Sequence, residues 1–526
     1  RAVMAAIAAR NPAEATRLHD GGEIALLDVR EHGQYGEAHL FYATPVPYSR
    51  LEIDAPRLAP RRGVRLVVYD EDGAAVAPRA AARLAAIGYT QVHVLQGGTR
   101  AWQAAGYPLF AGVNVPTKAF GEMVEHARHT PRISADELAA RLARGEPLQV
   151  LDGRPLGEFR KMSIPTAICC PNGELALRVR GIVPDERTPI VVNCAGRTRS
   201  IIGAQTLIDL GLPNPVMALE NGTQGWYLAG HVLDHGRQAR YGEPSATPEA
   251  AARAKAWAIR AGVRFLDEQA AADALADGSR SVFLFDVRTA EEFAQGSLPG
   301  ARHAPGGQLV QALDQYAGVR GARFVLFDSD GVRAPMMAAW LAQMGHEVAV
   351  LEAGIASRAA LALPAEPTPP TLRAAPPAEV AARLARGEVA LVDLRPSMEF
   401  RKQHAALARW SIRPRLAQDL ALESRPVVLM ADTPALAAWA ALELPGKAVE
   451  CLEGGLPAWS AAGLPTGESP DAPPDADCID YLFFTHDRHD GNAAAARQYL
   501  AWETALLGQL DEQETGAWRI VTPRPA

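Results

Sequence analysis

Cysteine is scarce in this sequence, and long apolar runs and a strong excess of one charge are absent. The 526 residues include five cysteines, an odd number too low for a disulfide framework, which indicates a reducing compartment. No apolar run approaches the ~18 residues that a membrane span requires, and no signal-peptide pattern opens the chain. The formal net charge of −7 argues against a nucleic-acid-binding surface. We therefore expect a cytoplasmic protein with neither nucleic acid nor a membrane as partner.

A short motif recurs four times along the chain, which is long enough for three to five domains of roughly 100–150 residues each. Each copy is an apolar stretch that ends in Asp-x-Arg and continues into a charged or aromatic segment. The copies are LLDVREHGQY (26–35), VLDGRPLGEF (150–159), LFDVRTAEEF (284–293) and LVDLRPSMEF (391–400).

Two further features follow the motif at matching distances. A second apolar stretch ends at Asp70, Cys194 or Asp328, in each case 42 positions after the aspartate of the Asp-x-Arg motif. A turn closes each unit, in the forms LQGGTRAW, LENGTQGW, LEAGIASR and LEGGLPAW. Gly97 and Asn221 each lie 69 positions after the aspartate of their own unit. Matching distances in separate features indicate a fourfold repeat of one domain.

Stretches rich in proline and polar residues separate the repeats and suggest the domain boundaries. We expect domains at 1–115, 126–240, 250–362 and 373–467, followed by a C-terminal tail at 475–526. The first junction, near 115–130, is the least marked by composition. Within each unit, short apolar strands alternate with amphipathic helical patterns, which predicts an α/β fold. Each domain is expected to be a parallel sheet flanked by helices, and the tail to be partly helical.

With these three features, each unit resembles a rhodanese domain, the small α/β fold of the sulfurtransferases. The resemblance rests on the Asp-x-Arg strand end, the strand that leads into a cysteine-headed loop and helix, and the Leu-x-Gly-Gly-x-x-x-Trp turn. It extends, as four tandem copies, to about Gly467. Rhodaneses form a cysteine persulfide on such a loop, so the resemblance implies that Cys194 is the catalytic nucleophile.

The stretch VVNCAGRTRS (191–200) offers a physical reason for a cysteine at this place. Its apolar residues predict a strand, and SIIGAQTLIDLGLP predicts a helix that begins at Ser200. A tight loop before a helix start directs free backbone N–H groups and the positive end of the helix dipole at the Cys194 thiol. We expect these groups to lower the pKa of that thiol and to stabilise an anionic persulfide.

The remainder of the loop is expected to bind the sulfur donor. Arg197 should point outward to meet an anionic donor, whereas Arg199, just before the helix, should also shape the loop. The candidate substrate-binding residues are Ala195, Gly196, Arg197, Thr198, Arg199 and Ser200. Asp152 and Arg154 are supporting residues. Because the Asp-x-Arg pair recurs in every unit, it is expected to be an ion pair internal to the fold.

The other three units lack the nucleophile and are predicted to be inactive. Asp70 in unit one and Asp328 in unit three stand at the cysteine position, where a carboxylate can cap the next helix but carries no transferable sulfur. Unit three keeps Arg333 at the offset that Arg199 has from Cys194, and unit four has neither residue.

Four residues separate Cys194 from Arg199 in unit two, one fewer than separate the cysteine and arginine in the loop of tyrosine phosphatases. The shorter loop favours sulfur over a phosphoryl group.

Other features have competing interpretations. Cys169 and Cys170 could relay sulfur or form a disulfide with Cys194, but packing is favoured. Trp226 is expected in the core. Periodicity predicts a helix at 492–509, although no function is assigned to the tail. The residues before that helix include His486, Asp487, His489 and Asp490. Such a run on one loop seldom converges on one ion, so no metal site is predicted. A solvated loop is favoured, and a contact to the active-site rim of another unit is the next alternative.

We expect a sulfurtransferase with one working site in four units. A sulfane sulfur would pass from a small donor through a Cys194 persulfide to a thiophilic acceptor such as cyanide, a small thiol or a protein thiol. Two loop arginines match the dianion thiosulfate. The alternatives are a 3-mercaptopyruvate sulfurtransferase, whose family loop Cys-Gly-Ser-Gly-Val-Thr differs from this one, and a scaffold or regulatory binding protein built from degenerate units. No cofactor is expected.

Overall fold

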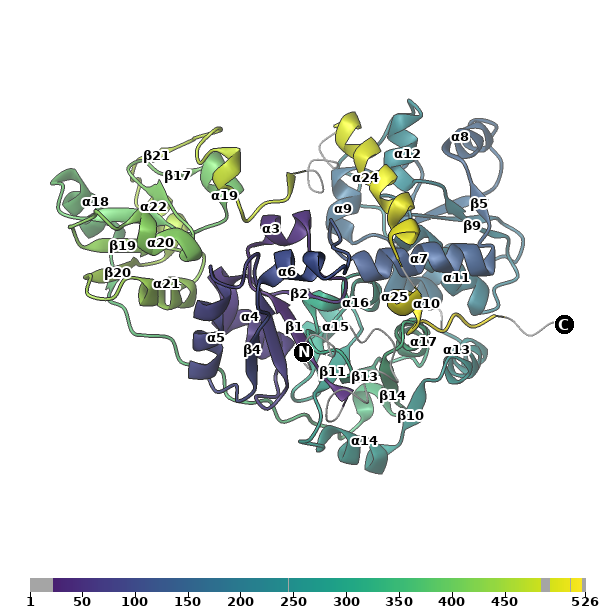
Figure 1. Ribbon diagram of the computed structural model, residues 1–526. Coiled ribbons are helices and arrows are strands. Elements are labelled where there is room, and N and C mark those ends of the chain that lie inside the picture. The colour runs from purple at the N-terminus through teal and green to yellow at the C-terminus, as the bar shows by residue number, and fades with distance from the viewer. Residues whose placement is uncertain (1–21, 245, 484–491, 511, 523–526) are drawn as a thin grey trace.

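Four separate parallel sheets, one in each repeat, follow one another along the chain (Figure 1). The structure, a computed structural model, describes residues 22–244, 246–483, 492–510 and 512–522. No helix within these ranges is long and apolar enough to cross a membrane. The α/β architecture expected from the alternating pattern is confirmed.

In the first repeat the strands are ordered β2-β1-β3-β4, all parallel. The strands are β1 (Ala25–Asp28), β2 (Thr44–Pro45), β3 (Leu66–Tyr69) and β4 (Val92–Val94). The helices are α3 (His32–Glu37), η2 (Tyr48–Arg50), α4 (Leu51–Leu58), α5 (Ala77–Ala86) and α6 (Gly98–Ala104). Strands β1 and β3 are short, apolar and fully buried, which is typical of a parallel sheet that is covered on both faces.

The second repeat, which contains Cys194, has the order β5-β9-β8-β6-β7. Its strands are β5 (Arg132–Ile133), β6 (Gln149–Asp152), β7 (Ile168–Cys169), β8 (Ile190–Asn193) and β9 (Val216–Leu219). Its helices are α8 (Ala135–Ala143), α9 (Leu156–Lys161), α10 (Asn172–Ile182), α11 (Thr198–Asp209) and α12 (Gly222–Leu228). The central strand β8 pairs with β6 on one side and β9 on the other.

The third and fourth repeats have the same strand order as the second, β10-β14-β13-β11-β12 and β15-β20-β19-β16-β18. The strands of the third are β10 (Arg264–Leu266), β11 (Val282–Asp286), β12 (Arg302–His303), β13 (Arg323–Phe327) and β14 (Glu347–Leu351). Its helices are α13 (Pro248–Arg260), α14 (Glu268–Leu275), α15 (Ala290–Gln295), α16 (Gly306–Gln311), η3 (Leu313–Gln315), α17 (Arg333–Gln343) and η4 (Gly354–Ala356).

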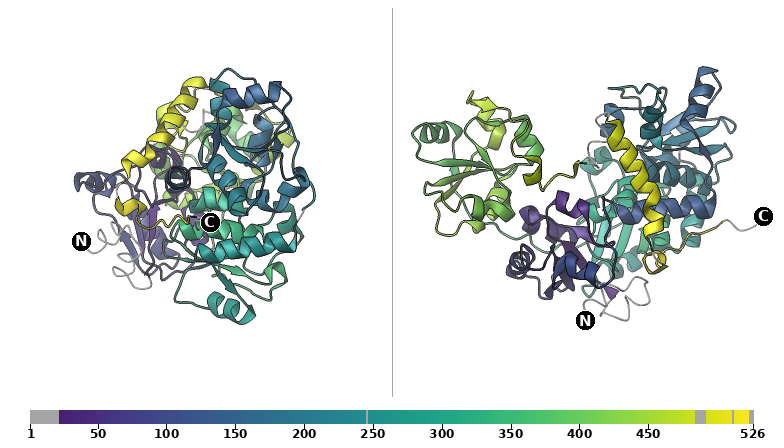
Figure 2. Two further views of the ribbon diagram at one scale, coloured as in Figure 1. Left: turned by 90° about the vertical axis from the view of Figure 1, so that its right-hand side faces the viewer. Right: turned by 45° about the horizontal axis from the view of Figure 1, so that its top comes forward.

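The fourth repeat adds a small antiparallel pair, β17 with β21, to its main sheet. The strands are β15 (Ala374–Ala375), β16 (Ala390–Asp393), β17 (His404–Ala405), β18 (Arg409–Trp410), β19 (Val427–Met430), β20 (Val449–Leu452) and β21 (Thr466–Gly467). The helices are α18 (Pro377–Ala385), α19 (Ser397–Lys402), α20 (Arg413–Asp419), α21 (Pro434–Ala440), η5 (Ala441–Glu443) and α22 (Gly455–Ala461). This repeat lies to one side of the others (Figure 2) and is joined to the first by a buried ion pair between Arg413 and Glu52.

The Asp-x-Arg motif forms the same buried ion pair in all four repeats, as expected. In each, the arginine Nη2 is 2.7–2.8 Å from a carboxylate oxygen of the aspartate two positions earlier. It also donates to the carbonyl oxygen eight positions later, namely that of Ala38, Met162, Gly296 or Gln403. The pair therefore fixes the turn after the strand, and its presence in every repeat separates it from any reaction at one cysteine.

The segment near 115–130, expected to be a junction, forms a long helix, α7 (Val115–Arg128). This helix contacts α11 of the second repeat, and α11 also contacts α10 and α16. All residues of α11 from 198 to 207 are buried, because helices of two repeats surround it. Trp340 of the third repeat donates from Nε1 to Thr206 Oγ1 at 2.8 Å. The helix that follows Cys194 is thus held between repeats.

The tail returns from the fourth repeat to the second. Its elements are η6 (Asp475–Asp477), α24 (Ala493–Ala505), η8 (Leu506–Gln509) and α25 (Glu512–Thr515). The helix expected at 492–509 is confirmed as α24 and η8, with the Asn492 side chain accepting from the Ala495 N–H as its cap. Figure 1 shows α24, in yellow, beside α12 and across α7, both of which it contacts. The four residues His486, Asp487, His489 and Asp490 lie outside the described residues.

Candidate active site

Cys194 directly follows β8, and α11 begins at Thr198, two positions earlier than the sequence indicated. The carboxyl ends of parallel strands meet at one edge of a sheet, and ligands bind there in open α/β folds. Cys194 is at this edge, with neighbouring strands on both sides of β8. A ligand at its sulfur would therefore lie between the strand ends and the positive end of α11.

The Cys194 thiol is buried, with 2% of the residue exposed, and its Sγ is 2.9 Å from Ser200 Oγ. Burial raises the pKa of this thiol above its ordinary value, while Arg199 and hydrogen bonds from Ser200 act to lower it. The expected depression of the pKa is therefore not found in this arrangement. Removing a thiolate from water opposes ionisation more than the arginine and the serine favour it.

Arg199 forms a two-pronged ion pair with Glu158 of α9. Nη1 is 2.7 Å from Oε2 and Nη2 is 3.1 Å from Oε1. The guanidinium is close enough to Cys194 to favour the thiolate, and Glu158 fixes its direction. Asn172 donates to the Arg199 carbonyl oxygen at 2.8 Å, which holds the backbone at the start of α11. Arg199 thus places a positive charge near the sulfur and, through Glu158 and Asn172, braces the loop.

Arg197 does not point outward as the sequence suggested. Its side chain pairs with Glu122 of α7, with Nη2 2.9 Å from Oε2, and with Glu125, whose Oε1 is 3.2 Å from Nη2. It also donates to Asn221 at 3.4 Å, and only 10% of the side chain is exposed. The carboxylates of α7 turn this arginine toward the interior of the protein, where it ties the Cys194 loop to the inter-repeat helix.

The turn motif LENGTQGW positions the cysteine loop from the other side. The N–H groups of Thr223 and Gln224 donate to the carbonyl oxygens of Cys194 and Ala195, at 2.9 and 3.1 Å. Gly222 has a φ of 57°, and a Cβ there would lie 2.2 Å from the Cys194 carbonyl oxygen. Only glycine allows this approach. The same contact occurs in the first and third repeats, where Gly98 faces the carbonyl of Asp70 and Gly354 that of Asp328.

One residue at this site escaped the sequence analysis: Glu503 of the tail helix α24. Its Oε1 accepts from Thr198, at 2.9 Å from Oγ1 and 3.4 Å from the backbone N. Its Oε2 is 2.7 Å from the position that a Cβ on Gly196 would take. Glu503 lies four positions after Tyr499 on the buried stripe of the helix, so a carboxylate on an apolar stripe was the available signal.

The supporting residues brace the strand that carries the cysteine. Asn193 donates to Asp152 Oδ2 at 3.2 Å, next to the Asp152–Arg154 pair. Trp226 is in the core, as expected, and donates to the Val232 carbonyl oxygen at 2.9 Å.

The other cysteines lie in cores. All five cysteines are free. Cys169 and Cys170 are buried in two core clusters, and burial raises the pKa of the Cys169 thiol to about 12. This environment makes both thiols weak nucleophiles, in line with the packing interpretation.

At the cysteine position of the first and third repeats, an aspartate caps the next helix, as expected. Asp70 accepts from the N–H groups of Asp72, Gly73, Val76 and Ala77, and Asp328 from those of Asp330, Gly331 and Ala334. These carboxylates use the backbone donors that would otherwise face a ligand. In both loops, these backbone N–H groups are therefore already occupied by the aspartate at the head of the loop.

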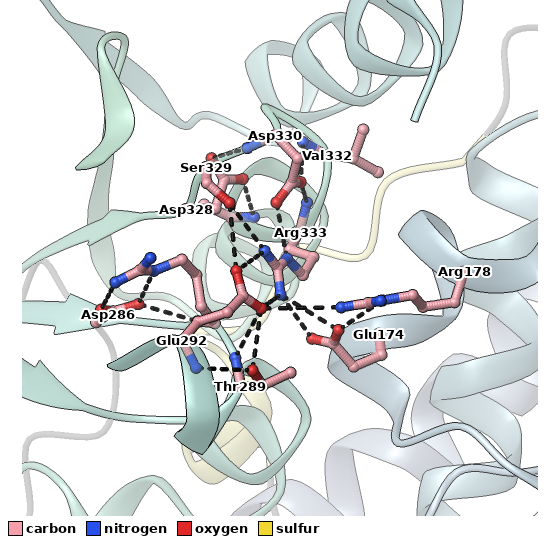
Figure 3. Close-up of polar contacts among 12 residues, drawn as sticks. Glu174, Arg178, Asp286, Thr289, Glu292, Asp328, Ser329, Asp330, Val332 and Arg333 are labelled. Atoms are coloured by element: carbon pink, nitrogen blue, oxygen red, sulfur yellow. Dashed lines mark hydrogen bonds and ion pairs between the residues drawn. The ribbon is translucent and has the colours of Figure 1, made fainter. Parts of the chain in front are cut away.

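Arg333 of the third repeat is held more tightly than its counterpart Arg199. Nη1 is 2.7 Å from Glu292 and 3.2 Å from Glu174 of the second repeat, and Nε is 2.7 Å from Asp330. Figure 3 shows Arg333 between these carboxylates, with Arg178 beside Glu174 and also paired with Glu292. Arg333 is fully buried and compensated, so it serves as a tie between the second and third repeats.

Fold and site together define the class, a tandem α/β protein with one cysteine-centred site at a helix start. The chain belongs to the rhodanese family and is a rhodanese-type transferase. The family model, the rhodanese-like domain, matches residues 11–105, 134–229, 268–360 and 376–462. This confirms the resemblance drawn from the motifs.

Two proteins similar to this chain carry the name thiosulfate sulfurtransferase. The crystal structure of one from Pseudomonas aeruginosa is 43% identical, covers 99% of this chain and 98% of its own, and has a TM-score of 0.90. One from Azotobacter vinelandii is 29% identical over 242 residues, which is 38% of this chain and 88% of that protein. An HTH-type transcriptional regulator of Mycobacterium tuberculosis is 35% identical over 104 residues, 20% of this chain and 45% of that protein.

Proposed function

We propose that the protein transfers a sulfane sulfur from thiosulfate to a thiophilic acceptor through a persulfide on Cys194. One observation carries the proposal: Cys194 heads a loop at the N-terminus of α11, with Ser200 and Arg199 favouring its thiolate. At the same position, the first and third repeats have an aspartate. The choice of thiosulfate is supported by the two similar proteins that bear its name.

The first half-reaction is a displacement at sulfur. The Cys194 thiolate attacks the outer sulfur of thiosulfate, a new S–S bond forms, and the old S–S bond breaks with its electron pair leaving on sulfite. In the second half-reaction the acceptor, for example cyanide, attacks the outer sulfur of the persulfide. The electron pair returns to Cys194, the thiolate is regenerated, and thiocyanate leaves. Neither half-reaction requires an external oxidant or reductant.

The surrounding residues supply charge and direction. Arg199 and Ser200 stabilise the negative charge on sulfur in the thiolate and in the persulfide. Glu158 keeps the Arg199 guanidinium in place, so its contribution needs no reorganisation during the reaction. Thr198 provides a backbone N–H at the start of α11, a position suited to the anionic part of a donor.

Intact-mass measurement tests the proposal. Incubation with thiosulfate should add one sulfur, about 32 Da, to the wild-type chain, and cyanide should remove it. Cys194→Ser should show no adduct and no turnover, whereas Cys451→Ser, a buried cysteine in the fourth repeat, is the matched control and should behave as wild type. Incubation of the same three proteins with 3-mercaptopyruvate tests the alternative donor. An adduct that persists in Cys194→Ser would refute the assignment.

A further inference from the structure

The tail helix α24 places a carboxylate, Glu503, on the loop of Cys194. Glu503 is 1% exposed, so its carboxylate is removed from water. Oε1 accepts from the backbone N–H and hydroxyl of Thr198. Oε2 has no hydrogen-bond partner among the residues that the structure describes, although it faces Gly196 in the middle of the loop. A half-satisfied buried carboxylate is costly to a fold, which calls for a reason for its presence.

Packing elsewhere along the tail holds Glu503 in this position. Trp502 donates from Nε1 to the Ala111 carbonyl oxygen at 2.8 Å. The Lys118 ammonium lies 4.6 Å from the ring centres of both Tyr499 and Trp502. Leu506 is fully buried in an apolar cluster with residues of the first repeat and α7. These contacts fix α24 and so place Glu503 against the Cys194 loop. The position of the helix therefore does not depend on Glu503.

The place that Glu503 occupies is the one that suits an anion. The first N–H groups of α11 have no partner within the helix, and the dipole of this twelve-residue helix favours negative charge there. The nearby arginines are compensated, Arg197 by Glu122 and Glu125 and Arg199 by Glu158. Glu503 therefore adds a negative charge beside the sulfur, where it opposes ionisation of Cys194.

We propose that Glu503 is a specificity-determining residue that occupies the anion position of the site, so that a donor must displace its carboxylate from Thr198. The inference rests on the proposed sulfur transfer at Cys194. Repulsion from a buried carboxylate grows with the charge of the incoming group, so a dianion such as thiosulfate is disfavoured more than a monoanion or a neutral molecule. The tail of the chain thereby sets which donors the second repeat accepts.

Alkylation of Cys194 tests this without any sulfur transfer. Iodoacetate and iodoacetamide are similar in size and differ by one negative charge, and mass spectrometry of the Cys194 peptide gives both rates. In Glu503→Gln the ratio of the iodoacetate rate to the iodoacetamide rate should rise about tenfold relative to wild type. The ratio cancels any change in the pKa of the thiol. Glu186→Gln, an exposed carboxylate of the same repeat, is the control for net charge and should leave the ratio unchanged.

Steady-state kinetics then separates a charge effect from a role in the chemistry. Glutamine has the shape of glutamate and still accepts from Thr198, so the fold should be retained, which a thermal unfolding curve checks. With thiosulfate, Glu503→Gln should lower KM about tenfold, while KM for the monoanion 3-mercaptopyruvate should change less. An unchanged alkylation ratio, or exclusion of both reagents equally in both proteins, would overturn the proposal. A raised ratio without turnover would instead leave Glu503 as assigned and refute the proposed sulfur transfer.

Discussion

Arg199 pairs with Glu158 in the second repeat in the same way that Arg333 pairs with Glu292 in the third, with a shortest N···O distance of 2.7 Å in both. Each glutamate lies six positions after the aspartate of its Asp-x-Arg motif, and each arginine five positions after the head of its loop. In the first repeat the corresponding positions are Gln34 and Ala75, so both partners are absent together. The pair is thus present in the third repeat although the cysteine is not.

Arg199→Ala should impair the reaction through the thiol as well as through the donor. Loss of the guanidinium removes a group that lowers the pKa of Cys194, so less thiolate is present at neutral pH. We expect kcat/KM for thiosulfate to fall roughly 10–150-fold, the equivalent of about 1.5–3 kcal/mol. Arg199→Lys should recover part of the loss, because a point charge remains without the two-pronged contact to Glu158. Equal activity of the alanine variant and wild type would contradict this role.

Arg197→Ala should lower stability more than it alters donor binding. The substitution leaves Glu122 buried without its cation, and breaking such a pair typically costs about 3–5 kcal/mol of the free energy of unfolding. Urea unfolding should register this loss, and Arg197→Ala combined with Glu122→Gln should recover part of it. KM for thiosulfate should stay within about twofold of wild type. A large rise in KM at unchanged stability would show that the side chain meets the donor after all.

Gly222 and Gly230 form a matched pair for testing how the turn holds the cysteine loop. Both have positive φ, 57° and 84°, but a Cβ on Gly222 would lie 2.2 Å from the Cys194 carbonyl oxygen, whereas one on Gly230 meets nothing within 4 Å. Gly230→Ala should therefore cost about 1 kcal/mol in stability and leave kcat/KM unchanged. Gly222→Ala should cost as much or more and also reduce kcat, by displacing the loop. Similar activities of the two variants, measured with thiosulfate, would count against the positioning role of the turn.

Asp328→Cys should not create a second working site. The new thiol would face backbone donors, but Arg333 is already bound by Glu292, Glu174 and Asp330 and cannot turn to a donor. In a Cys194→Ser background, this variant should give no sulfur adduct by intact mass after incubation with thiosulfate. A further variant adds Glu174→Gln to that background, because this removes one of the three carboxylates that hold Arg333. An adduct in the first variant would show that the arginine is freer than the structure indicates.

The raised pKa of the Cys194 thiol predicts a pH dependence of stability with a definite sign. The folded protein binds this proton more tightly than the unfolded chain does. The stability that the proton contributes is complete below the unfolded pKa, about 8.5, and is lost as pH rises through the folded value. Relative to wild type, Cys194→Ser should therefore lose less free energy of unfolding above about pH 8.5. Urea unfolding of both proteins across this range measures the difference, and a difference independent of pH would contradict the shift.

Local patterns in the sequence predicted the parts of the structure that depend on near neighbours. The four strand ends, the aspartate caps and the tail helix each follow from residues a few positions apart, such as Asp328 and the N–H of Gly331. The equal distances between motifs added the repeat itself.

Contacts made over long distances in the chain could not be predicted in this way. The carboxylates that turn Arg197 inward come from α7, with Glu122 75 positions earlier. The residue that covers Thr198 comes from α24, 305 positions later. The two arginines of the loop predicted a cationic site, but the carboxylates that compensate their charges belong to other helices. Charge at the site is a property of the assembled repeats, which no single motif records.

The separation of Thr198 and Glu503 also has a consequence for how the site matures. A ribosome adds roughly 5–20 residues per second, so some 15–60 s pass between synthesis of the cysteine loop and synthesis of the helix that covers it. During that interval the second repeat can fold without a carboxylate at the start of α11. The site is complete only when α24 arrives and brings the Glu503 carboxylate to Thr198.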